Sequence, residues 1–570
     1  MTDVLRHEKK IIASLFFLAL LLRGLALSFG LPGLFHADEP IVLNHALAYA
    51  SGDLNPHFFK IPPLVSYLLF GVFGIYYFLG HLAGVFANPS VFEQFFYAEP
   101  ASFYILARVI FGAFAGSLTV VFFYRTIRQH FGALRAVAAA FFLAVCFLHV
   151  ADSHYLYADI PLLLVLVIAV GFFWRLNSAS GFGFHAIAGA LIGIAAAVKY
   201  NGVFIGAVYG VMLIGWRGGY RAKTLFGAVA ALSAAAVFCM LNPFAVMDRS
   251  FFIDELQAQS RAQNGVGWLH HGLYSLPGAV GWPMLAAALA GFGAVLGCPQ
   301  TRDDRVKRCA LLVFTAGYYA VLVYAGQPYP RYVLPLLPGI LFFAADFLVF
   351  IAEAKKCKKI LGIGIILLSL FPFSKSILWC RLMNAQDVRT EAKIWFEKNV
   401  PSGVPTALDW DFYMPRLNFT PKQLRIKKAE AQASESFGGS KIRKLQALIQ
   451  RSSEEPSYEL YFLVPKPQEQ ERFLLASPVL PYDLKAVQEQ GVQFAAVLPG
   501  IRQPAAPQFY EDLARTSKLL HTFSPYRNGR LLPYDTVDMT GGPFTWNEIL
   551  HRRCNGHTIQ IYALKGRAAA

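Results

Sequence analysis

Long apolar stretches separated by short polar connections dominate the chain up to about residue 380. A membrane-crossing helix needs about 20 mostly apolar residues, and somewhat fewer where a short helix ends at a cavity. By this measure the pattern predicts about eleven membrane-spanning helices. They cover Ile11–Phe29, Phe103–Tyr124, Phe131–Val150, Asp159–Arg175, Phe184–Val198, Gly202–Trp216, Lys223–Leu241, Pro277–Leu296, Ala310–Ala325, Tyr332–Ile351 and Ile360–Leu378. The chain is therefore predicted to be a polytopic α-helical membrane protein.

The cations in the connections predict the orientation of these helices, because cytoplasmic loops carry an excess of Lys and Arg. The basic connections contain Arg125, Arg128 and Arg135; Arg217, Arg221 and Lys223; Arg302, Arg305, Lys307 and Arg308; and Lys355, Lys356, Lys358 and Lys359. With a cytoplasmic N-terminus, strict alternation puts all of them inside, provided that Pro62–Val85 does not cross. We therefore predict that Pro62–Val85, which is interrupted by Gly71 and Gly74, forms a re-entrant or surface-lying pair of juxtamembrane helices in an outer loop at 30–102.

From about Asn384 the composition changes to that of a soluble domain, with Asp, Glu, Lys and Gln returning. Periodicity predicts helices and strands there in alternation. The helices are Asp387–Val400 and Gln508–Leu519, and the strands are Val404–Trp410, Tyr458–Val464, Val492–Val497 and Thr558–Ala563. The sequence thus predicts a transmembrane domain over residues 1–382 and a small α/β domain over residues 383–570 on the outer face.

The composition supports a membrane protein. Of the 570 residues, 56% are hydrophobic and only 15% are charged, and the mean hydropathy is +0.44. A soluble domain would carry about a quarter charged residues. The net charge of +16 lies mostly in the short connections, so it indicates helix orientation and no nucleic-acid partner. Lys441 and Lys444, with Glu454 and Glu455, are typical of solvated surface.

Two further features limit the possibilities. The seven cysteines have no spacing typical of a metal site or a disulfide framework. The first apolar run follows a basic N-terminus, as in a signal peptide, but it is longer than a typical signal core and lacks a small-residue cleavage site. We therefore predict a retained helix.

Acidic residues stand at predicted outer membrane edges. Asp38 and Glu39 follow the first apolar run, and Asp159 begins a later one. One interpretation is solvation at the interface, with Asp38 as the N-cap of a helix in which Pro40 is a favoured early residue. The other makes Asp38 a general base in a pocket open to the outer leaflet. Because Asp159 lies at an equivalent edge on the same predicted side, the functional interpretation is favoured.

Cations recur at the same edge. Lys199 lies in a tight turn, because the next apolar run begins at once after Gly202. It either extends to the interface or holds an anionic headgroup. Arg331 lies in a proline-rich turn that positions its guanidinium, which is suited to bidentate phosphate contact. Lys60 is a third candidate cation. His36, His57 and His154 can ligate metals, but scattered histidines are more often structural. We therefore expect no metal and no other cofactor.

Acids beside cations at the edge of a lipid-like bundle suit a substrate with an apolar tail, a phosphate and a group to transfer. A lipid-phosphate-linked sugar has all three. Departure of the sugar develops negative charge on the phosphate, which Arg331 and Lys199 can stabilise. Positive charge develops at the anomeric carbon, and the acceptor hydroxyl must lose a proton, which Asp38 can take.

Several short motifs in this order resemble one family. They are Ala37-Asp38-Glu39, Lys60-Ile-Pro-Pro-Leu64, Ser153-His-Tyr-Leu-Tyr-Ala-Asp159, Val198-Lys199-Tyr-Asn-Gly202 and Arg331-Tyr-Val-Leu-Pro335. With them, residues 10 to 380 resemble the GT-C fold polyprenol-phosphate-sugar-dependent glycosyltransferases. This group contains the protein O-mannosyltransferases and the lipid A aminoarabinose transferase. The chain departs from the lipid A type at Lys60, where Ile61 precedes the two prolines.

The resemblance implies an inverting transfer on the periplasmic face of a bacterial inner membrane. It implies Asp38 as general base, with Glu39 and Asp159 as further catalytic residues, Asp159 supporting the acceptor site. It places Lys60, Lys199, Arg331 and Tyr332 on the donor phosphate, and His36, His57, His154, Tyr200 and Asn201 in acceptor or supporting roles. The implied partners are a polyprenyl-phosphate-linked sugar donor, a lipid, glycan or protein acceptor, and membrane lipids.

Two rival interpretations stay open. An oligosaccharide ligase with a pyrophosphate-linked donor would be favoured by more cations and a metal-binding acid cluster, which the sequence lacks. A lipid or glycan transporter would be favoured by inverted repeats and by charges in the middle of the membrane. Here the charges stand at helix ends.

Overall fold

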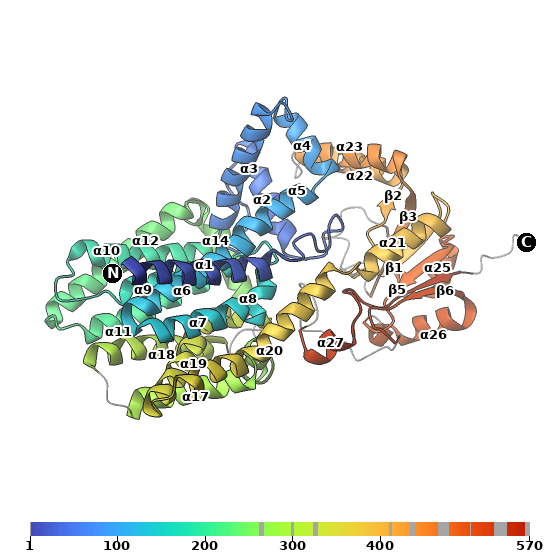
Figure 1. Cartoon of the computed structure of the whole chain (residues 1–570). Coiled ribbons are helices and arrows are strands. Elements are labelled where there is room, and N and C mark those ends of the chain that lie inside the picture. Colours follow the sequence, from blue (N-terminus) through green and yellow to red (C-terminus); the bar gives the residue numbers. More distant parts are fainter. Residues whose placement is uncertain are drawn as a thin grey trace, which may run out of the picture. The chain divides into compact units, whose positions relative to one another are not determined.

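The computed structural model describes residues 2–260, 267–297, 301–322, 329–409, 413–433, 439–465, 478–501, 503–528 and 544–564. The chain forms two compact units (Figure 1). The first, called the helical unit, comprises Met1–Leu27, Asp38–Phe73 and Tyr104–Cys380. The second, called the α/β unit, comprises Ser28–Ala37, Gly74–Phe103 and Arg381–Ala570.

Helices make up the helical unit (Figure 1). They are α1 (Thr2–Gly24), α2 (Glu39–Ala48), η1 (Tyr49–Ser51), the start of α3 (Leu64–Leu82), the end of α5 (Ala101–Ala107), η2 (Arg108–Phe114), α6 (Ala115–Phe131), α7 (Ala133–Val145), α8 (Phe147–Asp152), α9 (Asp159–Phe173), α10 (Phe182–Val198), η3 (Tyr200–Ile205), α11 (Gly206–Gly215), α12 (Tyr220–Leu241), α13 (Phe244–Met247), α14 (Arg249–Ser260), α15 (Gly267–His270), η4 (His271–Ser275), α16 (Leu276–Val280), α17 (Trp282–Gly297), α18 (Arg302–Leu322), η5 (Pro330–Leu336), α19 (Leu337–Ala354) and most of α20 (Lys358–Asn384). Each predicted span has helix in its place, so the predicted helical membrane fold is confirmed.

Several of these helices are shorter than a bilayer. Among the described residues, 5 helices are long and apolar enough to cross a membrane, or up to 6 if the bent pair His271–Val280 and Trp282–Ala294 is one span. The shorter apolar helices are Ala133–Val145, Asp159–Phe173, Phe182–Val198 and Tyr200–Gly215. The predicted number of about eleven spans therefore stays a prediction.

Two buried cations, Arg23 and Lys375, donate hydrogen bonds to carbonyl groups at breaks between short helices. Helix α7 ends at Val145, and the extended backbone of the next residue, Cys146, frees carbonyl groups that a continuous helix would use. The Arg23 guanidinium donates to the carbonyls of Leu143 and Ala144, at 3.1 and 2.9 Å. The Lys375 ammonium likewise donates to the Gly278 carbonyl at 2.6 Å. Buried carbonyls need such partners, so both cations stabilise the broken helices.

The apolar stretch Pro62–Val85 forms one unbroken helix, α3, followed by α4 (Pro89–Ala98). An aromatic cluster of Tyr76, Phe86 and Phe92 joins the end of α3 to α4, with ring centroids 4.9 to 5.7 Å apart. By length and composition α3 can cross a membrane. That it does not cross therefore stays a prediction.

A mixed sheet lies at the centre of the α/β unit, in the order β2-β3-β1-β5-β7-β6, with β4 beside β3. Strands β1, β3 and β5 are parallel, and β7 is antiparallel to β5 and β6. The elements are α21 (Val388–Asn399), β1 (Pro405–Asp409), β2 (Asn418–Phe419), α22 (Pro421–Ala433), α23 (Gly439–Glu454), β3 (Ser457–Val464), β4 (Val479–Pro481), α25 (Leu484–Glu489), β5 (Phe494–Val497), η6 (Gln503–Ala505), α26 (Pro507–Thr516), β6 (Lys518–Phe523), α27 (Trp546–His551) and β7 (Ile559–Ala563). The predicted α/β architecture is confirmed.

Hydrophobic side chains pack on both faces of this sheet. Phe396 of α21 packs in one cluster with Leu408, and Phe509 of α26 packs in another with Val497. The predicted helix Gln508–Leu519 was too long: it ends at Thr516, and Lys518–Phe523 pairs with β7 instead. Four of the six β6 side chains are exposed, so the strand lacks the alternating pattern that would have identified it. Trp410, the predicted end of the first strand, lies outside the described residues.

Candidate active site

Two acid–cation pairs meet around Tyr157 in the helical unit. The Arg331 guanidinium lies 2.9 Å from Asp38 Oδ2, and the Lys199 ammonium lies 2.6 Å from Asp159 Oδ1. The Tyr157 ring joins them, because Arg331 Cζ and Lys199 Nζ lie 4.7 and 5.5 Å from its centroid. Residues far apart in the sequence, all at predicted outer edges, thus form one cluster.

Helix ends position each member of this cluster. Asp38 precedes α2, Asp159 is the first residue of α9, and Lys199 follows α10 with an extended backbone. Arg331 lies in the short helix η5, which Pro330 begins. Asp38 makes no side-chain hydrogen bond to the α2 backbone. The N-cap interpretation therefore does not account for its carboxylate.

Tyrosine rings surround the cations. Arg331 Cζ also lies 4.8 Å from the Tyr329 ring centroid, and Lys199 Nζ lies 5.4 Å from that of Tyr332. Such contacts stabilise cations within about 6 Å of a ring centroid. Burial raises the pKa of the Tyr157 phenol, so that it stays protonated and can donate a hydrogen bond. Sequence reasoning did not single out Tyr157, although it lies two residues before Asp159 in a quoted motif.

Within the described part of the chain, some buried polar atoms of the cluster have no hydrogen-bond partner. They are Asp159 Oδ2, Arg331 Nε and the side-chain oxygen of Asn201. The Asn201 amide nitrogen, in contrast, donates to the Tyr318 hydroxyl at 2.5 Å. Buried polar atoms are nearly always paired, so these atoms indicate a place where a polar ligand or water binds.

Glu39 lies in a closed network. Its carboxylate accepts two hydrogen bonds from Arg108, at 2.7 and 2.6 Å, and one from the Leu156 backbone amide at 2.8 Å. Arg108 also donates to the Leu27 carbonyl. Glu39 and Arg108 are fully buried. Glu39, which follows Asp38 in the sequence, is thus hydrogen-bonded to Leu156, which precedes Tyr157. Sequence reasoning missed Arg108, although a single Arg inside an apolar span is a known signal.

Close packing places the loop that carries Tyr157. A Cβ atom on Gly112, in η2, would clash with the Ser153 carbonyl. Only glycine therefore allows η2 to approach the end of α8 so closely.

Lys60 and His57 lie on the exposed loop before α3. Lys60 Nζ is 6.0 Å from the Phe58 ring centroid, and His57 pairs with Asp53 at 2.9 Å. Tyr200 donates to the Phe59 carbonyl at 2.8 Å, which fixes the same loop. This hydrogen bond makes Tyr200 a support for the loop that carries Lys60.

The other two candidate histidines, His36 and His154, are buried. His154 Nδ1 lies 2.8 Å from the Val150 carbonyl, and the His154 ring packs on Trp379 with centroids 4.8 Å apart. His36 is 2% exposed and lies in the α/β unit. In the described part of the chain, no group of three or more His, Cys, Asp or Glu residues can hold a metal ion.

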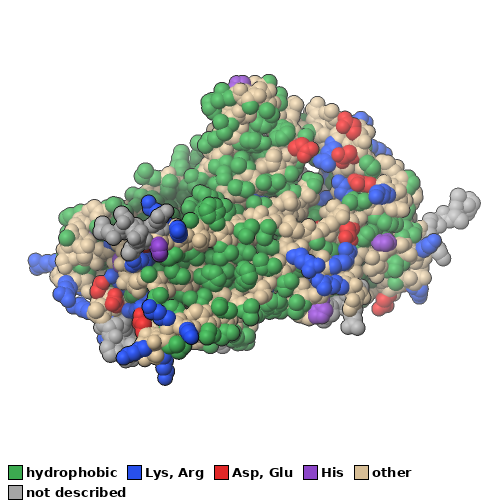
Figure 2. All heavy atoms as spheres, in the orientation of Figure 1, with side chains coloured by type: hydrophobic (Ala, Val, Ile, Leu, Met, Phe, Trp, Pro, Cys, Tyr) green, Lys and Arg blue, Asp and Glu red, His purple; other side chains and the backbone are tan. Residues whose placement is uncertain are grey.

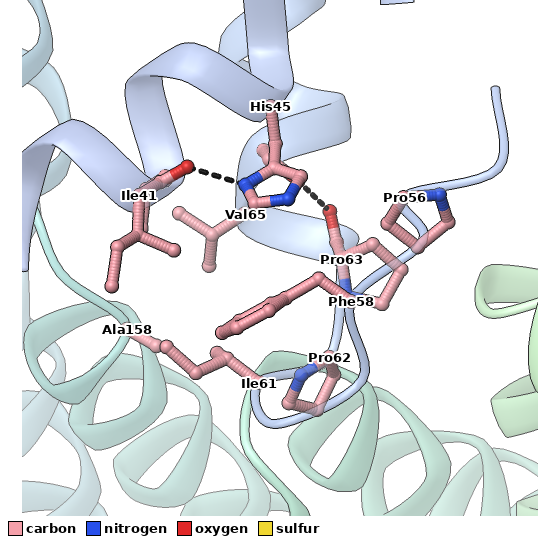
Figure 3. A pocket seen from close by; sticks show the side chains of 11 residues that line it. Ile41, His45, Pro56, Phe58, Ile61, Pro62, Pro63, Val65 and Ala158 are labelled. Atoms are coloured by element: carbon pink, nitrogen blue, oxygen red, sulfur yellow. Dashed lines mark hydrogen bonds between the residues drawn. The ribbon is translucent and has the colours of Figure 1, made fainter. Parts of the chain in front are cut away.

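Residues that are close in sequence to members of the cluster line an apolar pocket (Figure 3). It contains about 330 Å³ of empty space, part of it open to solvent. Its walls include Ile41 of α2, Phe58 and Ile61 of the Lys60 loop, and Ala158, which precedes Asp159. Figure 3 shows the His45 ring in this wall, with its Nδ1 2.6 Å from the Ile41 carbonyl. Residues close in sequence to both candidate acids therefore line an apolar pocket.

One family model matches the chain. It describes dolichyl-phosphate-mannose-protein mannosyltransferases and matches residues 101–254, about a quarter of the chain, including Asp159 and Lys199. The match confirms the resemblance to membrane glycosyltransferases of the GT-C fold over this segment. Comparison with curated protein sequences gives no significant match.

Several solved structures are similar. ArnT from Cupriavidus metallidurans bound to undecaprenyl phosphate has 13% sequence identity and a TM-score of 0.49, covering 95% of this chain and 100% of that chain. The archaeal oligosaccharyltransferase AglB from Archaeoglobus fulgidus has 12% identity and a TM-score of 0.46, covering 92% and 74%. The S. cerevisiae Pmt1–Pmt2 protein O-mannosyltransferase complex bound to the sugar donor has 23% identity and a TM-score of 0.29, covering 43% and 34%.

Proposed function

We propose that this multi-pass membrane protein is a glycosyltransferase that moves a sugar from a polyprenyl-phosphate donor to an acceptor hydroxyl, with inversion. One observation carries the proposal. The Asp38–Arg331 and Asp159–Lys199 pairs meet around Tyr157, where buried atoms of Asp159, Arg331 and Asn201 lack hydrogen-bond partners among the described residues. The family-model match and the adjoining apolar pocket support it.

Arg331 and Lys199 hold the donor phosphate in this mechanism. The Arg331 Nη1 atom faces Asp38, and Nε, which has no hydrogen-bond partner among the described residues, is one arm of a fork suited to phosphate. Lys199 adds a compact positive charge beside the same tyrosine. As the sugar leaves, negative charge grows on the phosphate, and these fixed cations stabilise it.

Asp38 acts as the general base. The acceptor hydroxyl donates its proton to the Asp38 carboxylate, and its oxygen attacks the anomeric carbon opposite the phosphate. The bond from the anomeric carbon to the phosphate oxygen breaks, and the electron pair leaves with the lipid phosphate. A single displacement inverts the anomeric centre. Asp159 orients Lys199 and, through its second oxygen, the acceptor.

Glu39 takes a positioning role in this proposal. Both of its oxygens already accept hydrogen bonds from Arg108 and Leu156, so the carboxylate has little capacity left for a substrate. It instead fixes Asp38 relative to the loop of Tyr157. Lys60 and Tyr332 remain donor-side candidates, while His36, His57, His154 and Tyr200 take supporting roles. We propose no metal or other cofactor.

We place the reaction on the periplasmic face of a bacterial inner membrane, with a cytoplasmic N-terminus and a periplasmic α/β unit. The four basic connections named above support this orientation. The acceptor is a hydroxyl of a lipid, a glycan or a protein.

The direct test uses the full-length protein in proteoliposomes with a panel of labelled polyprenyl-phosphate sugars. We expect at least one donor to be consumed and Asp38→Asn to abolish its consumption. No turnover of any lipid-monophosphate sugar, with turnover of a pyrophosphate-linked oligosaccharide, would replace the proposal with an oligosaccharide ligase. Uphill or downhill movement of an intact lipid-linked sugar without cleavage would indicate a transporter.

A further inference from the structure

Phe59, the residue before Lys60, is held at both of its backbone groups. Its amide donates to Glu255 Oε2 of α14 at 2.8 Å, and its carbonyl accepts from the Tyr200 hydroxyl at 2.8 Å. Glu255 and Tyr200 lie 196 and 141 positions away from Phe59 in the sequence. Two distant elements, α14 and the turn after Lys199, therefore fix the backbone of the loop that carries Lys60.

Helix α14 contacts this loop in two further ways. The Phe59 ring, which is 1% exposed, packs edge-on against Phe251 and Phe252, with ring centroids 5.9 and 5.6 Å apart. The Asn55 amide nitrogen donates at 3.2 Å to Oδ2 of Asp248, the residue before α14. The loop is thus attached to α14 and its first flanking residue by a backbone hydrogen bond, a side-chain hydrogen bond and aromatic packing.

The same loop has a backbone conformation that is unfavourable by itself. His57 has a φ of +45°, in the left-handed region that residues other than glycine rarely adopt. Such conformations persist only where contacts elsewhere over-determine them, and they are concentrated at active sites and ligand clamps. His57 lies between Asn55 and Phe59, the two loop residues that α14 and Asp248 hold. These contacts therefore keep the loop in a shape that it would not favour alone.

The position of this loop matters for the candidate site. Phe58 and Ile61 line the apolar pocket together with Ala158, as Figure 3 shows. Lys60 lies between Phe58 and Ile61 in the sequence, and Ala158 precedes Asp159. A movement of the loop would therefore shift the pocket wall and Lys60 together, relative to the start of α9.

The donor of the proposed reaction has an apolar chain and a charged phosphate. Hydrophobic side chains cover much of the helical unit on the face drawn in Figure 2, as on a lipid-facing surface. The phosphate stays near the helix ends, because burying its charge among acyl chains is costly. A loop there binds the phosphate best if it is ordered beforehand, because ordering it on binding costs free energy.

We propose that Glu255 is a positioning residue for donor binding. Its hydrogen bond to the Phe59 amide fixes the backbone so that Lys60, the next residue, faces the lipid phosphate. The inference rests on the proposed function, since it requires a lipid phosphate at this site. Glu255 itself does not touch the donor, and its negative charge, which would repel a phosphate, is used to hold the loop.

The test measures binding of polyprenyl phosphate, without a sugar, to the full-length protein in nanodiscs. We expect Glu255→Ala to raise the Kd by about tenfold, the factor for one hydrogen bond to a charged group. Asp254→Ala removes the same charge from an exposed neighbour on α14 and should leave the Kd unchanged. Glu255→Gln keeps an acceptor oxygen and should retain most of the affinity. Equal Kd values for Glu255→Ala and Asp254→Ala would overturn the proposal.

Two further variants show whether Glu255 acts through the loop. Tyr200→Phe removes only the hydrogen bond to the Phe59 carbonyl and should also weaken binding. Lys60→Met should weaken it more, and adding Glu255→Ala to Lys60→Met should change the Kd little, because the positioned group is already gone. Full additivity of these two changes would show that Glu255 does not act through Lys60, and the proposal would be wrong.

The outcomes separate this inference from the proposed function. Wild-type protein that binds polyprenyl phosphate more tightly than Arg331→Lys, with no effect of Glu255→Ala, would overturn the positioning role alone. Wild-type protein that does not bind polyprenyl phosphate at all would overturn both. The melting temperature of each variant is measured beside the Kd, and faster amide exchange of residues 53–61 in Glu255→Ala is expected where the protein stays folded. Unchanged exchange there would exclude Glu255 as the group that holds the loop.

Discussion

Two buried acid–cation networks of the helical unit differ in whether their buried polar atoms all have hydrogen-bond partners among the described residues. Around Asp346, Arg135 and Arg308 donate to both carboxylate oxygens at 2.6 and 2.8 Å, and Arg135 also pairs with Glu353. None of these residues has a buried polar atom without a partner, among the atoms described. Around Tyr157, by contrast, Asp159, Arg331 and Asn201 each have one.

We call the Asp346 network complete, because its buried polar atoms have partners among the described residues. We call the network around Tyr157 open, because some of its buried polar atoms have none there. A complete network stabilises the fold and has no capacity left for a ligand. An open network in a buried place is destabilising until something binds it. The Glu39–Arg108 network is complete, although Glu39 is next to Asp38 in the sequence. Adjacent carboxylates can therefore have opposite roles, and the predictions below test this distinction.

The largest effect is expected for Asp38→Asn. The amide keeps the size of the carboxylate but cannot accept a proton at neutral pH. Loss of a general base lowers the rate by about 10²–10⁴-fold. The transfer rate at saturating donor and the melting temperature together check this, and only the rate should fall. Asp303→Asn, at an exposed acid in the first turn of α18, is the control. Equal activity of the two variants would leave Asp38 without a catalytic role.

Glu39→Gln should act on stability first. It leaves the buried Arg108 without its charged partner, and breaking such a pair destabilises by about 3–5 kcal/mol. We expect a large fall in the melting temperature in detergent, and a rate per folded molecule that falls less than in Asp38→Asn. If the melting temperature is unchanged and the rate falls as in Asp38→Asn, Glu39 is itself catalytic.

Arg331→Lys should impair the donor step without unfolding the protein. Lysine keeps the charge but lacks the planar fork for phosphate. Removing one donor that stabilises a developing oxyanion lowers the rate by about 10²–10³-fold, and we expect less where a charge remains. The change should appear in kcat or in the donor KM. Arg308→Lys, in the complete network, is the matched control and should change the melting temperature alone. Wild-type kinetics in Arg331→Lys would exclude a phosphate contact that requires the fork.

Much of this site was visible in the sequence because charges at membrane edges stand out against apolar runs. Asp38, Asp159, Lys199 and Arg331 were identified in this way, and the structure brings them together. The helices and the main strands followed from apolar periodicity. Each of these features depends on residues close together in the chain.

The features that were missed depend on residues far apart. Glu39 and Arg108 are 69 positions apart, and Arg23 and His149 are 126 apart. No local period records such a pairing. The break at Cys146 is equally hidden, because the apolar run continues through it and two of its carbonyls accept hydrogen bonds from the distant Arg23. Whether a buried polar atom has a partner is known only once the chain has folded.

The smallest effect is expected for Glu353→Gln, at the edge of the complete network. The Glu353 side chain is 54% exposed, and solvent screens its pair with Arg135. Exposed ion pairs contribute about 0–1 kcal/mol, so the melting temperature should change little. The transfer rate should not change, because Asp346 still holds Arg135 and nothing in this network faces a ligand. Both quantities are measured on the purified protein beside Arg331→Lys. If Glu353→Gln lowers the rate as much as Arg331→Lys while the melting temperature is unchanged, completeness of hydrogen bonding does not separate structural from catalytic networks in this protein.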